Sequence, residues 1–285
     1  MSLIIDGKLI SSQIKNELKD EVLALKNKGV IPTLAVIQIG DVHASNVYIR
    51  NKKKAAEDIG IKFIHFQFNE NIDNQTLLEK IGEINNDQSI HGLFVQLPLP
   101  KHINENDVIN KINPNKDVDC FSLINIGKLW TAKKDNLVIK PCTPAGIIEL
   151  LKRSNVELSG KDVVIVGRSN IVGKPLGALF LLENATVTIC HSRSKDLANI
   201  CKKADVLVSA VGISKFIKKD FIKQGAVVVD VGINRNEEGK ICGDVDFENV
   251  KSLTSKITPV PGGVGPMTVA MLMKNLVQLT KLQNK

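Results

Sequence analysis

Short runs of β-branched residues alternate along the chain with longer amphipathic stretches, and this alternation limits the folds that the chain can adopt. Each run has the length of one buried strand, and each amphipathic stretch has the length of a helix that covers one face of a sheet. Strands that alternate with helices form mainly parallel sheets, because each helix carries the chain back to the edge where the preceding strand began. The sequence therefore predicts an α/β fold.

In the first half, the pattern predicts three strands and three helices. The strands are expected at residues 33–39, 62–68 and 92–97, and the helices at residues 11–28, 44–59 and 74–85. Regular structure should stop at Leu97-Pro98-Leu99-Pro100, because proline lacks a backbone donor and restricts the residue before it.

A second series of strands and helices should follow. Thr143-Pro144 predicts the start of a helix that runs to about Arg153, since threonine can cap a helix and proline suits its first position. The last helix should begin near Met267. The strands expected between these helices are residues 162–166, 186–190, 206–210, 226–231 and 256–259.

The length of 285 residues is enough for two ordinary domains. We predict a first domain at residues 1–142, a second at 143–268, and a helix at 269–285 that returns to the first domain. A cleft between two domains is a common place for a ligand, so we expect the functional site there.

The composition of 43% apolar and 24% charged residues is typical of a globular protein, and no apolar run is long enough to span a bilayer. The start of the chain, Met1 to Lys8, lacks the apolar core of a signal peptide. Five cysteines form no C-x-x-C pair and five histidines show no ligand spacing. We therefore expect a cytoplasmic protein with no membrane partner, no metal and no disulfide framework.

A net charge of +8 raises the alternative of a basic nucleic-acid-binding α/β module. The lysines and arginines are spread along the chain, with one tight cluster at Lys52-Lys53-Lys54, and aromatics make up only 4%. So few aromatics cannot build base-stacking platforms, and anionic small ligands would account for the charge equally well. We expect no nucleic acid partner; a steeply salt-dependent affinity for DNA or RNA would favour the alternative.

A glycine-containing turn follows the predicted strand at residues 162–166. Gly167-Arg168-Ser169 precedes Gly173, where a helix is expected to begin. Glycines let the backbone approach a phosphate, and a helix N-terminus favours its negative charge. The spacing departs from the usual G-x-G-x-x-G, so a purely structural turn remains an alternative; we predict a Rossmann-like dinucleotide-binding domain.

The end of the next strand indicates which dinucleotide binds. NAD-preferring sites usually carry an acid there, which accepts from the ribose 2′-hydroxyl. Here the strand is followed by His191-Ser192-Arg193-Ser194, which has hydroxyls and a cation but no acid. Together with Arg168, these groups suit a 2′-phosphate and favour NADP. A solvated basic loop is the alternative.

Three features of the first half carry polar groups that suit chemistry. Tyr48 and Lys52 lie four positions apart, on one face of a predicted helix. Gln96 stands among apolar residues at a strand end, and Lys116-Asp117-Val118-Asp119 places two acids on a loop. Each feature alone also has an ordinary interpretation, such as a lysine stem that packs against an aromatic ring or a solvated loop.

Taken together and in order, these motifs resemble the bifunctional methylenetetrahydrofolate dehydrogenase/methenyltetrahydrofolate cyclohydrolase family over essentially the whole chain. The matching stretches are Tyr48-x-x-x-Lys52, Val95-Gln96-Leu97-Pro98-Leu99-Pro100, Lys116 to Asp119, Pro141-Cys142-Thr143-Pro144, Gly167-Arg168-Ser169 with Val172-Gly173, Gly243-Asp244-Val245, and Pro259 to Thr268. One departure is Cys120, where the family commonly has glycine; cysteine tolerates a positive φ poorly, so the loop conformation at this position is open.

The resemblance implies a role for each matching residue. Lys52 is the expected central catalytic group, with Gln96 hydrogen-bonded to it, Tyr48 stacked on the folate and Asp119 bound to the pterin edge. The implied substrate site also includes Ser45, Val95, Leu97, Pro261, Gly262, Gly263, Val264 and Gly265. The implied cofactor site consists of Gly167, Arg168, Ser169, Gly173, Ser192, Arg193 and Ile233.

The resemblance further implies an N-terminal catalytic domain, a C-terminal NADP-binding domain, a homodimer, and a role in one-carbon metabolism that supports purine biosynthesis. The expected activity is NADP-dependent oxidation of 5,10-methylenetetrahydrofolate to the methenyl form, followed by hydrolysis to 10-formyltetrahydrofolate. A partly buried Lys52 would have its neutral form favoured beside the methenyl cation and would accept the proton from water. An enzyme with little cyclohydrolase activity is the alternative.

Overall fold

The computed structural model describes residues 3–131, 133 and 136–284. The chain forms two compact units, each of which combines separate stretches of sequence. The first unit contains the residues up to Ser12 together with Pro141–Thr268, and the second contains Gln13–Lys140 together with the residues from Val269 on. Two long helices, α1 (Gly7–Lys26) and α10 (Val264–Gln283), each contribute to both units.

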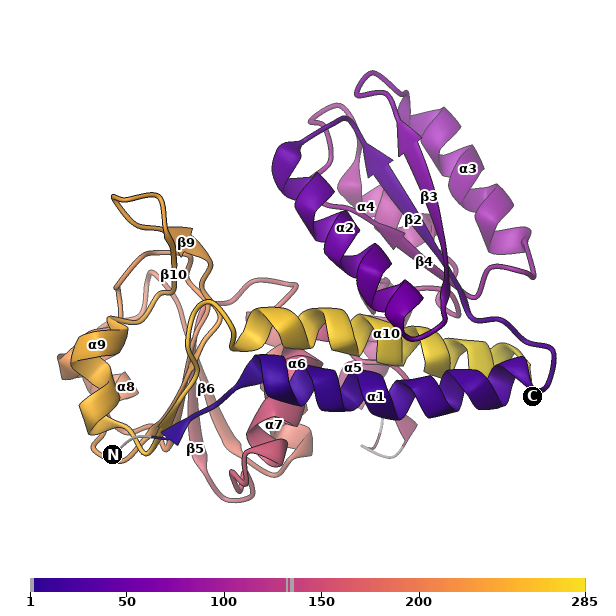
Figure 1. Ribbon diagram of the computed structural model, residues 1–285. Helices are drawn as coiled ribbons and strands as arrows, with labels where there is room; N and C mark the ends of the chain where they lie inside the picture. The colour runs from indigo at the N-terminus through magenta and orange to yellow at the C-terminus, as the bar shows by residue number, and fades with distance from the viewer. Residues whose placement is uncertain (1–2, 132, 134–135, 285) are drawn as a thin grey trace. The chain divides into compact units, whose positions relative to one another are not determined.

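The first unit is built on a six-stranded parallel sheet, of which Figure 1 labels β5 and β6. The strand order is β1-β11-β8-β7-β5-β6. Its strands are β1 (Leu3–Ile4), β5 (Asp162–Val166), β6 (Thr186–Cys190), β7 (Val206–Ser209), β8 (Val227–Asp230) and β11 (Lys256–Ile257). The next two strands along the chain after β5 lie on opposite sides of it, so the topology reverses there. Such a switch point is where open parallel sheets bind ligands.

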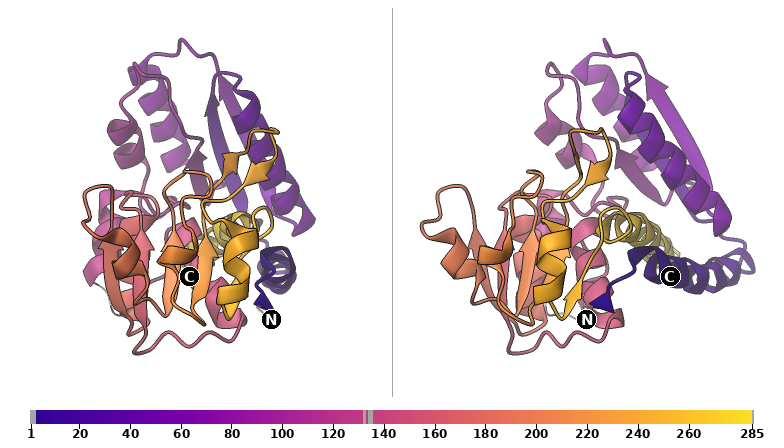
Figure 2. Two further views of the ribbon diagram at one scale, coloured as in Figure 1. Left: turned by 90° about the vertical axis from the view of Figure 1, so that its left-hand side faces the viewer. Right: turned by 60° about the vertical axis from the view of Figure 1, so that its left-hand side comes forward.

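Helices and a small hairpin complete the first unit. The helices are α6 (Cys142–Arg153), α7 (Gly173–Leu182), α8 (Leu197–Cys201) and α9 (Phe247–Val250), with 3₁₀ turns at Lys219–Phe221 and Lys251–Leu253. The hairpin, β9 (Asn234–Arg235) and β10 (Ile241–Cys242), follows β8 and extends away from the sheet (Figure 2). Buried Val164, Leu207 and Val228 from three neighbouring strands form the centre of the core, as expected for a parallel sheet.

The second unit contains a three-stranded parallel sheet in the order β3-β2-β4. Its strands are β2 (Thr33–Ile39), β3 (Lys62–Phe68) and β4 (Gly92–Val95), and its helices include α2 (His43–Asp58), α3 (Asn74–Asn86), α4 (Glu105–Lys111) and α5 (Leu123–Thr131). All seven residues of β2 are buried because this strand is central. Leu77 and Ile81 of α3 pack with Ile37 and Leu93 in the core.

The predicted α/β class with two domains is confirmed, and most predicted elements agree with the structure to within a few residues. Four predicted strands have the observed bounds: β2, β3, β5 and β6. The strand predicted at 92–97 ends at Val95, the one at 206–210 ends at Ser209, the one at 226–231 is Val227–Asp230, and the one at 256–259 ends at Ile257. The exact boundaries of the predicted domains stay a prediction.

The predicted capping role of Thr143 is wrong. Helix α6 begins one residue earlier, at Cys142, with Pro141 in the cap position and no side-chain cap hydrogen bond. Thr143 therefore lies inside the first turn, and its hydroxyl is hydrogen-bonded to that of Thr268 at 3.0 Å. The last helix likewise begins at Val264 rather than near Met267.

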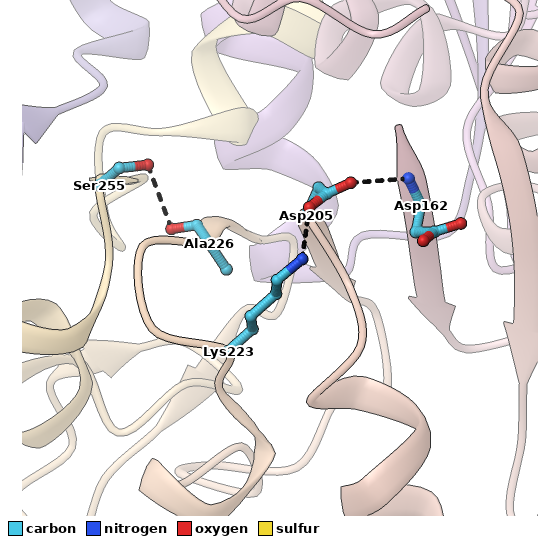
Figure 3. Close-up of polar contacts among 5 residues, drawn as sticks. All are labelled: Asp162, Asp205, Lys223, Ala226 and Ser255. Atoms are coloured by element: carbon cyan, nitrogen blue, oxygen red, sulfur yellow. Dashed lines mark hydrogen bonds and ion pairs between the residues drawn. The ribbon is translucent and has the colours of Figure 1, made fainter. Parts of the chain in front are cut away.

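Asp205 links segments at the amino ends of strands in the six-stranded sheet, as Figure 3 shows. One carboxylate oxygen accepts from the backbone N–H of Asp162 at 3.0 Å, and the other accepts from Lys223 Nζ at 2.7 Å. These contacts join the starts of β5 and β7 to the loop before β8. They lie at the amino ends of the strands, away from the carboxyl ends at which ligands bind in such sheets.

No helix among the described residues is long and apolar enough to cross a membrane.

Within the second unit, Asn275 of α10 fixes the loop after β4. Its side-chain N–H groups donate to the carbonyl oxygens of Val118 and Lys140, both at 2.8 Å. Its carbonyl oxygen accepts from the backbone N–H of Lys140 at 3.4 Å. The side chain is buried, so water cannot replace these partners.

We predict that Asn275→Ala lowers the free energy of unfolding by about 2–3 kcal/mol, because it removes buried hydrogen bonds to the backbone of Val118 and Lys140. Unfolding in urea can be followed by the fluorescence of Trp130, which is the single tryptophan and lies in the same unit. Gln75→Ala, which removes an exposed contact with Glu79, is the control and should change stability by less than about 0.5 kcal/mol. Equal effects of the two substitutions would contradict the role assigned to Asn275.

Candidate active site

Lys52 is a buried lysine of the second unit. It lies on α2, and its Nζ donates to Gln96 Oε1 at 3.2 Å. The same Nζ lies 3.4 Å from the centroid of the Phe94 ring. Gln96 directly follows β4 and is oriented by a hydrogen bond from its Nε2 to the carbonyl oxygen of Leu97. The predicted contact between Lys52 and Gln96 is thus present, and Phe94 is an additional partner that the sequence did not indicate.

Ser45 and Tyr48 lie on the same face of α2 as Lys52, one to two turns before it. Ser45 is buried, whereas 45% of Tyr48 is exposed, so its ring is accessible to a planar ligand. The start of the helix is held by Asn46, whose side chain accepts from Gln38 and donates to Asp41, both at 2.7 Å. These contacts fix the segment that presents Tyr48 and Lys52.

The Lys116–Asp119 motif divides into structural and accessible charges. Lys116 Nζ donates to the carbonyl oxygens of Ile84 and Asp87, at 2.9 and 2.6 Å, and burial lowers the pKa of this lysine. The Asp117 carboxylate accepts from the backbone N–H of Ser122 and from the side chain of Asn125, at 2.9 and 3.0 Å. Both side chains therefore form hydrogen bonds that hold the fold.

Asp119 is the half-buried acid of the motif. It borders a small cavity together with Val95 and Leu97, and Phe94 lines the same space. Val95, Leu97 and Asp119, which the sequence predicted, therefore lie together with Phe94 at the end of β4. Lys52 and Gln96 are connected to this group through Phe94, so one region of the second unit carries an amine, an amide and a carboxylate.

Cys120 adopts the conformation that glycine would adopt at this position, with a φ of 61°. Its thiol is buried and lies 3.8 Å from the carbonyl oxygen of Ile139. Burial, with a further contribution from the nearby carboxylates of Asp117 and Asp119, raises the pKa of the thiol far above its usual value. Cys120 is thus accommodated in the left-handed conformation that favours glycine, and its buried thiol is unreactive.

In the first unit, the turn after β5 has the close backbone packing of a phosphate-binding loop. Gly167 has a φ of 133°, and a Cβ on Gly173 would lie 2.0 Å from the carbonyl oxygen of Gly167. The Ser169 hydroxyl accepts from the backbone N–H groups of Val172 and Gly173, at 3.1 and 3.4 Å, where α7 begins. A phosphate fits such a turn, because the backbone can approach closely and the helix N-terminus favours negative charge.

The end of β6 lies directly beside this turn, since the backbone N–H of Gly167 donates to the carbonyl oxygen of Cys190 at 2.9 Å. The loop that follows is held by His191, whose backbone N–H donates to Ser194 Oγ at 2.9 Å. Arg168, Ser192 and Arg193 are all exposed at this edge of the sheet. Hydroxyl and guanidinium groups in this position fit a 2′-phosphate, as the sequence predicted.

Ile233, predicted to line the cofactor site, is 56% exposed after β8. The structure adds two exposed isoleucines at the same edge that the sequence analysis missed: Ile171 in the glycine turn and Ile213 after β7. The sequence signal that would have identified them is an isoleucine near a glycine in the turn after a predicted strand. Such apolar side chains suit the flat faces of a dinucleotide.

The Pro261–Gly265 loop, also predicted to contact the folate, belongs to the first unit. Gly262 has a φ of 110°, and its carbonyl oxygen accepts from the backbone N–H of Lys8 at 3.1 Å. A Cβ on Gly7 would lie 1.8 Å from the carbonyl oxygen of Gly263. The loop therefore packs tightly on the start of α1, and its contact with the substrate stays a prediction.

Two buried carboxylates lie at the carboxyl edge of the six-stranded sheet: Asp230 is the last residue of β8, and Asp244 follows β10 and contacts the loop after β7. The sequence did not indicate a role for either. Asp230 accepts from the backbone N–H groups of Gly232, Asp244 and Val245, at 2.9–3.0 Å. Burial raises the pKa of Asp230 to about 6, against the opposing effect of these donors. Among the described residues there is no cluster of three His, Cys, Asp or Glu side chains that could hold a metal.

We predict that Asp230 makes the protein less stable as the pH rises. Because its pKa is higher in the folded protein than in the unfolded chain, the stabilisation is fully present below about pH 4 and is lost as the pH rises through about 6. The free energy of unfolding of the wild type, minus that of Asp230→Asn, should therefore decrease as the pH rises from about 4 to about 7, by up to roughly 3 kcal/mol.

Asp73 is the control, because hydrogen bonds from Thr76 lower the pKa of its carboxyl, and its contribution should change in the opposite direction with pH. Thermal unfolding of the wild type and Asp230→Asn between about pH 4 and 7 tests the first sign, and the wild type and Asp73→Asn below about pH 4, where the contribution of Asp73 is lost as the pH falls, test the second. A pH-independent difference between the wild type and Asp230→Asn would contradict the raised pKa.

Both units match models of one protein family. Residues 5–119 match the catalytic domain, and residues 141–284 the NAD(P)-binding domain, of the family described as tetrahydrofolate dehydrogenase/cyclohydrolase. The chain is 57% identical to "Bifunctional protein FolD" of Agathobacter rectalis, over 99% of this chain and 100% of the relative. It is 55% identical to the protein of the same name from Bacillus subtilis, over 98% of this chain and 97% of the relative.

Solved structures show the same similarity. The bifunctional FolD methylenetetrahydrofolate dehydrogenase/cyclohydrolase of Campylobacter jejuni superposes with a TM-score of 0.96 at 48% identity, and 99% of each chain is covered. The dehydrogenase-cyclohydrolase of Trypanosoma brucei, solved with NADP and an inhibitor, superposes with a TM-score of 0.94 at 38% identity, covering 100% of this chain and 99% of that chain.

Proposed function

This chain belongs to the tetrahydrofolate dehydrogenase/cyclohydrolase family, and we propose that one folate site, built around Lys52, serves both of its reactions. The enzyme oxidises 5,10-methylenetetrahydrofolate to the 5,10-methenyl form with NADP and hydrolyses that product to 10-formyltetrahydrofolate. The observation that carries the proposal is the hydrogen bond between buried Lys52 and Gln96.

The two reactions make different demands on the protein. For the oxidation, a bound NADP would supply the hydride acceptor, so the protein mainly has to bind and align the substrate. Hydrolysis requires a proton acceptor, because water adds to the methenyl carbon and must lose a proton. The second proton of the water moves to N5 as the bond between that nitrogen and the carbon breaks, which leaves the formyl group on N10.

We assign the proton acceptor to Lys52 Nζ. A cationic methenyl ring beside an amine favours the neutral form of that amine, which can then take a proton from water. Gln96 holds Nζ in position through its carbonyl oxygen, and its own amide is oriented by the carbonyl of Leu97. The Phe94 ring restricts the space around Nζ.

We assign folate binding to Tyr48 and Asp119, with Ser45, Val95 and Leu97 beside them. The exposed ring of Tyr48 offers a face for the folate's aromatic portion. Asp119 can accept hydrogen bonds from N–H groups of the pterin, and the hydrogen bonds of Lys116 and Asp117 hold the loop that carries it.

We assign NADP binding to Gly167, Arg168, Ser169 and Gly173, together with the 192–193 turn and Ile233. The absence of an acid after β6 and the exposed arginines favour the 2′-phosphate. We further propose that the enzyme is a cytoplasmic homodimer without a nucleic acid partner. Free cysteines fit a reducing compartment, and light scattering would test the dimer.

We predict that Lys52→Met lowers the cyclohydrolase rate by at least about 10²-fold, the lower end of what general acid–base catalysis contributes. The dehydrogenase rate should fall less, because hydride transfer needs alignment but no proton acceptor. Methenyltetrahydrofolate should therefore accumulate. The measurement follows NADPH formation and methenyl decay separately on one preparation.

Lys52→Arg is the matched variant, since it keeps the charge but cannot release its proton at working pH. It should not restore the cyclohydrolase reaction. Methenyl decay at the wild-type rate in either variant would remove Lys52 from the proposed role.

We predict that Asp119→Ala weakens folate binding in both reactions by roughly 10- to 150-fold, since a charge-assisted hydrogen bond is worth about 1.5–3 kcal/mol. The KM values for the methylene and methenyl substrates should rise together, while NADP binding stays the same. Cys120→Ser, one residue further along the loop, is the control for local disturbance. A rise in only one of the two KM values would count against a shared pterin site.

A further inference from the structure

Asp244 is a fully buried carboxylate that follows the β9–β10 hairpin of the first unit. One of its oxygens, Oδ2, accepts from Ser209 Oγ at 3.1 Å and from the backbone N–H groups of Val211 and Gly212 at 2.7 and 3.3 Å. The other, Oδ1, accepts from the backbone N–H of Ile213 at 3.0 Å and from Asn234 Nδ2 at 2.9 Å. Both oxygens are thus surrounded by donors.

The donors come from two separate segments. Ser209 ends β7, and Val211, Gly212 and Ile213 form the loop after it. Asn234 begins the hairpin that follows β8. A single side chain therefore ties the loop after one central strand to the segment after its neighbour, and Gly232 approaches so closely that a Cβ there would lie 2.1 Å from Asp244 Oδ1.

These two segments lie at the carboxyl edge of the sheet, the same edge as the glycine turn. The backbone N–H of Ala210 donates to the carbonyl oxygen of Val166, at the end of β5, which places the 210–213 loop beside Gly167. A Cβ on Gly167 would in turn lie 2.4 Å from the carbonyl oxygen of Ala210. Exposed Ile213 and Ile233 are carried by the two segments that Asp244 joins.

We propose that Asp244 is a positioning residue for the dinucleotide, which sets the loop at 211–213 and the segment at 232–234 in the arrangement that binds NADP. This inference rests on the proposed cofactor site. Asp244 does not itself contact the cofactor. A carboxylate is required because an acid accepts at both oxygens, whereas an amide would place its own N–H groups against donors. The surrounding donors also offset the negative charge of Asp244 close to an anionic ligand.

The test compares Asp244→Asn with Asp205→Asn. Both change one carboxylate of the same sheet into an amide, but Asp205 lies at the amino edge, where its contacts hold only the starts of strands (Figure 3). The dissociation constant of NADPH, measured by its fluorescence, should rise at least about 10-fold in Asp244→Asn and stay unchanged in Asp205→Asn. Far-UV circular dichroism and thermal unfolding of both variants show whether the first unit, which contains both residues, is folded.

A milder variant keeps the test decisive if Asp244→Asn does not fold. Asn234→Ala removes one part-buried donor and leaves the carboxylate with four partners, so the NADPH constant should rise several-fold with little change in stability. Unchanged NADPH binding in the soluble variant, with or without a loss of stability, would overturn the proposal. Gly173→Ala tests the cofactor site separately: if it leaves NADPH binding intact, the proposed site is wrong, whatever Asp244 does.

Discussion

Parallel pairing of strands places the end of every strand of a sheet at one edge, and both functional regions of this protein depend on that constraint. In the first unit, the turns after β5, β6, β7 and β8 all reach the carboxyl edge, although they are far apart in the sequence. In the second unit, β4 ends where Gln96 accepts a hydrogen bond from Lys52 of α2. The chemistry is carried by loops and helix faces, while the buried strands only fix where those loops begin.

Charged residues that are neighbours in the sequence have different roles in this protein, and their hydrogen bonds show which of them hold the fold. Lys116 and Asp117 are hydrogen-bonded to backbone and amide groups, and they hold the loop that carries Asp119. Asp244 has the same structural character in the other unit, where it joins two loops at the proposed cofactor site. In both places, a buried charge with many partners positions a region that stays available to a ligand.

The sequence predicted the strands well, because a buried parallel strand such as β2 or β5 is a short, largely apolar run rich in β-branched residues. It predicted the start of α6 poorly, because Thr143 can cap a helix or sit inside its first turn, and only the partner hydroxyl of Thr268 decides between the two. The pair of Lys52 and Gln96 was predictable through the family resemblance. The roles of Phe94 and Asp244 were not, since each depends on contacts between residues far apart in the chain.

The central claim is that one folate site performs two chemically different steps. The most direct test is inhibition of both reactions, on one enzyme preparation, by an unreactive tetrahydrofolate analogue that competes with the substrate. Binding at a single site predicts the same inhibition constant for the dehydrogenase and the cyclohydrolase reactions, at any fixed NADP concentration. An analogue that inhibits one reaction competitively while the other proceeds undiminished would contradict the account.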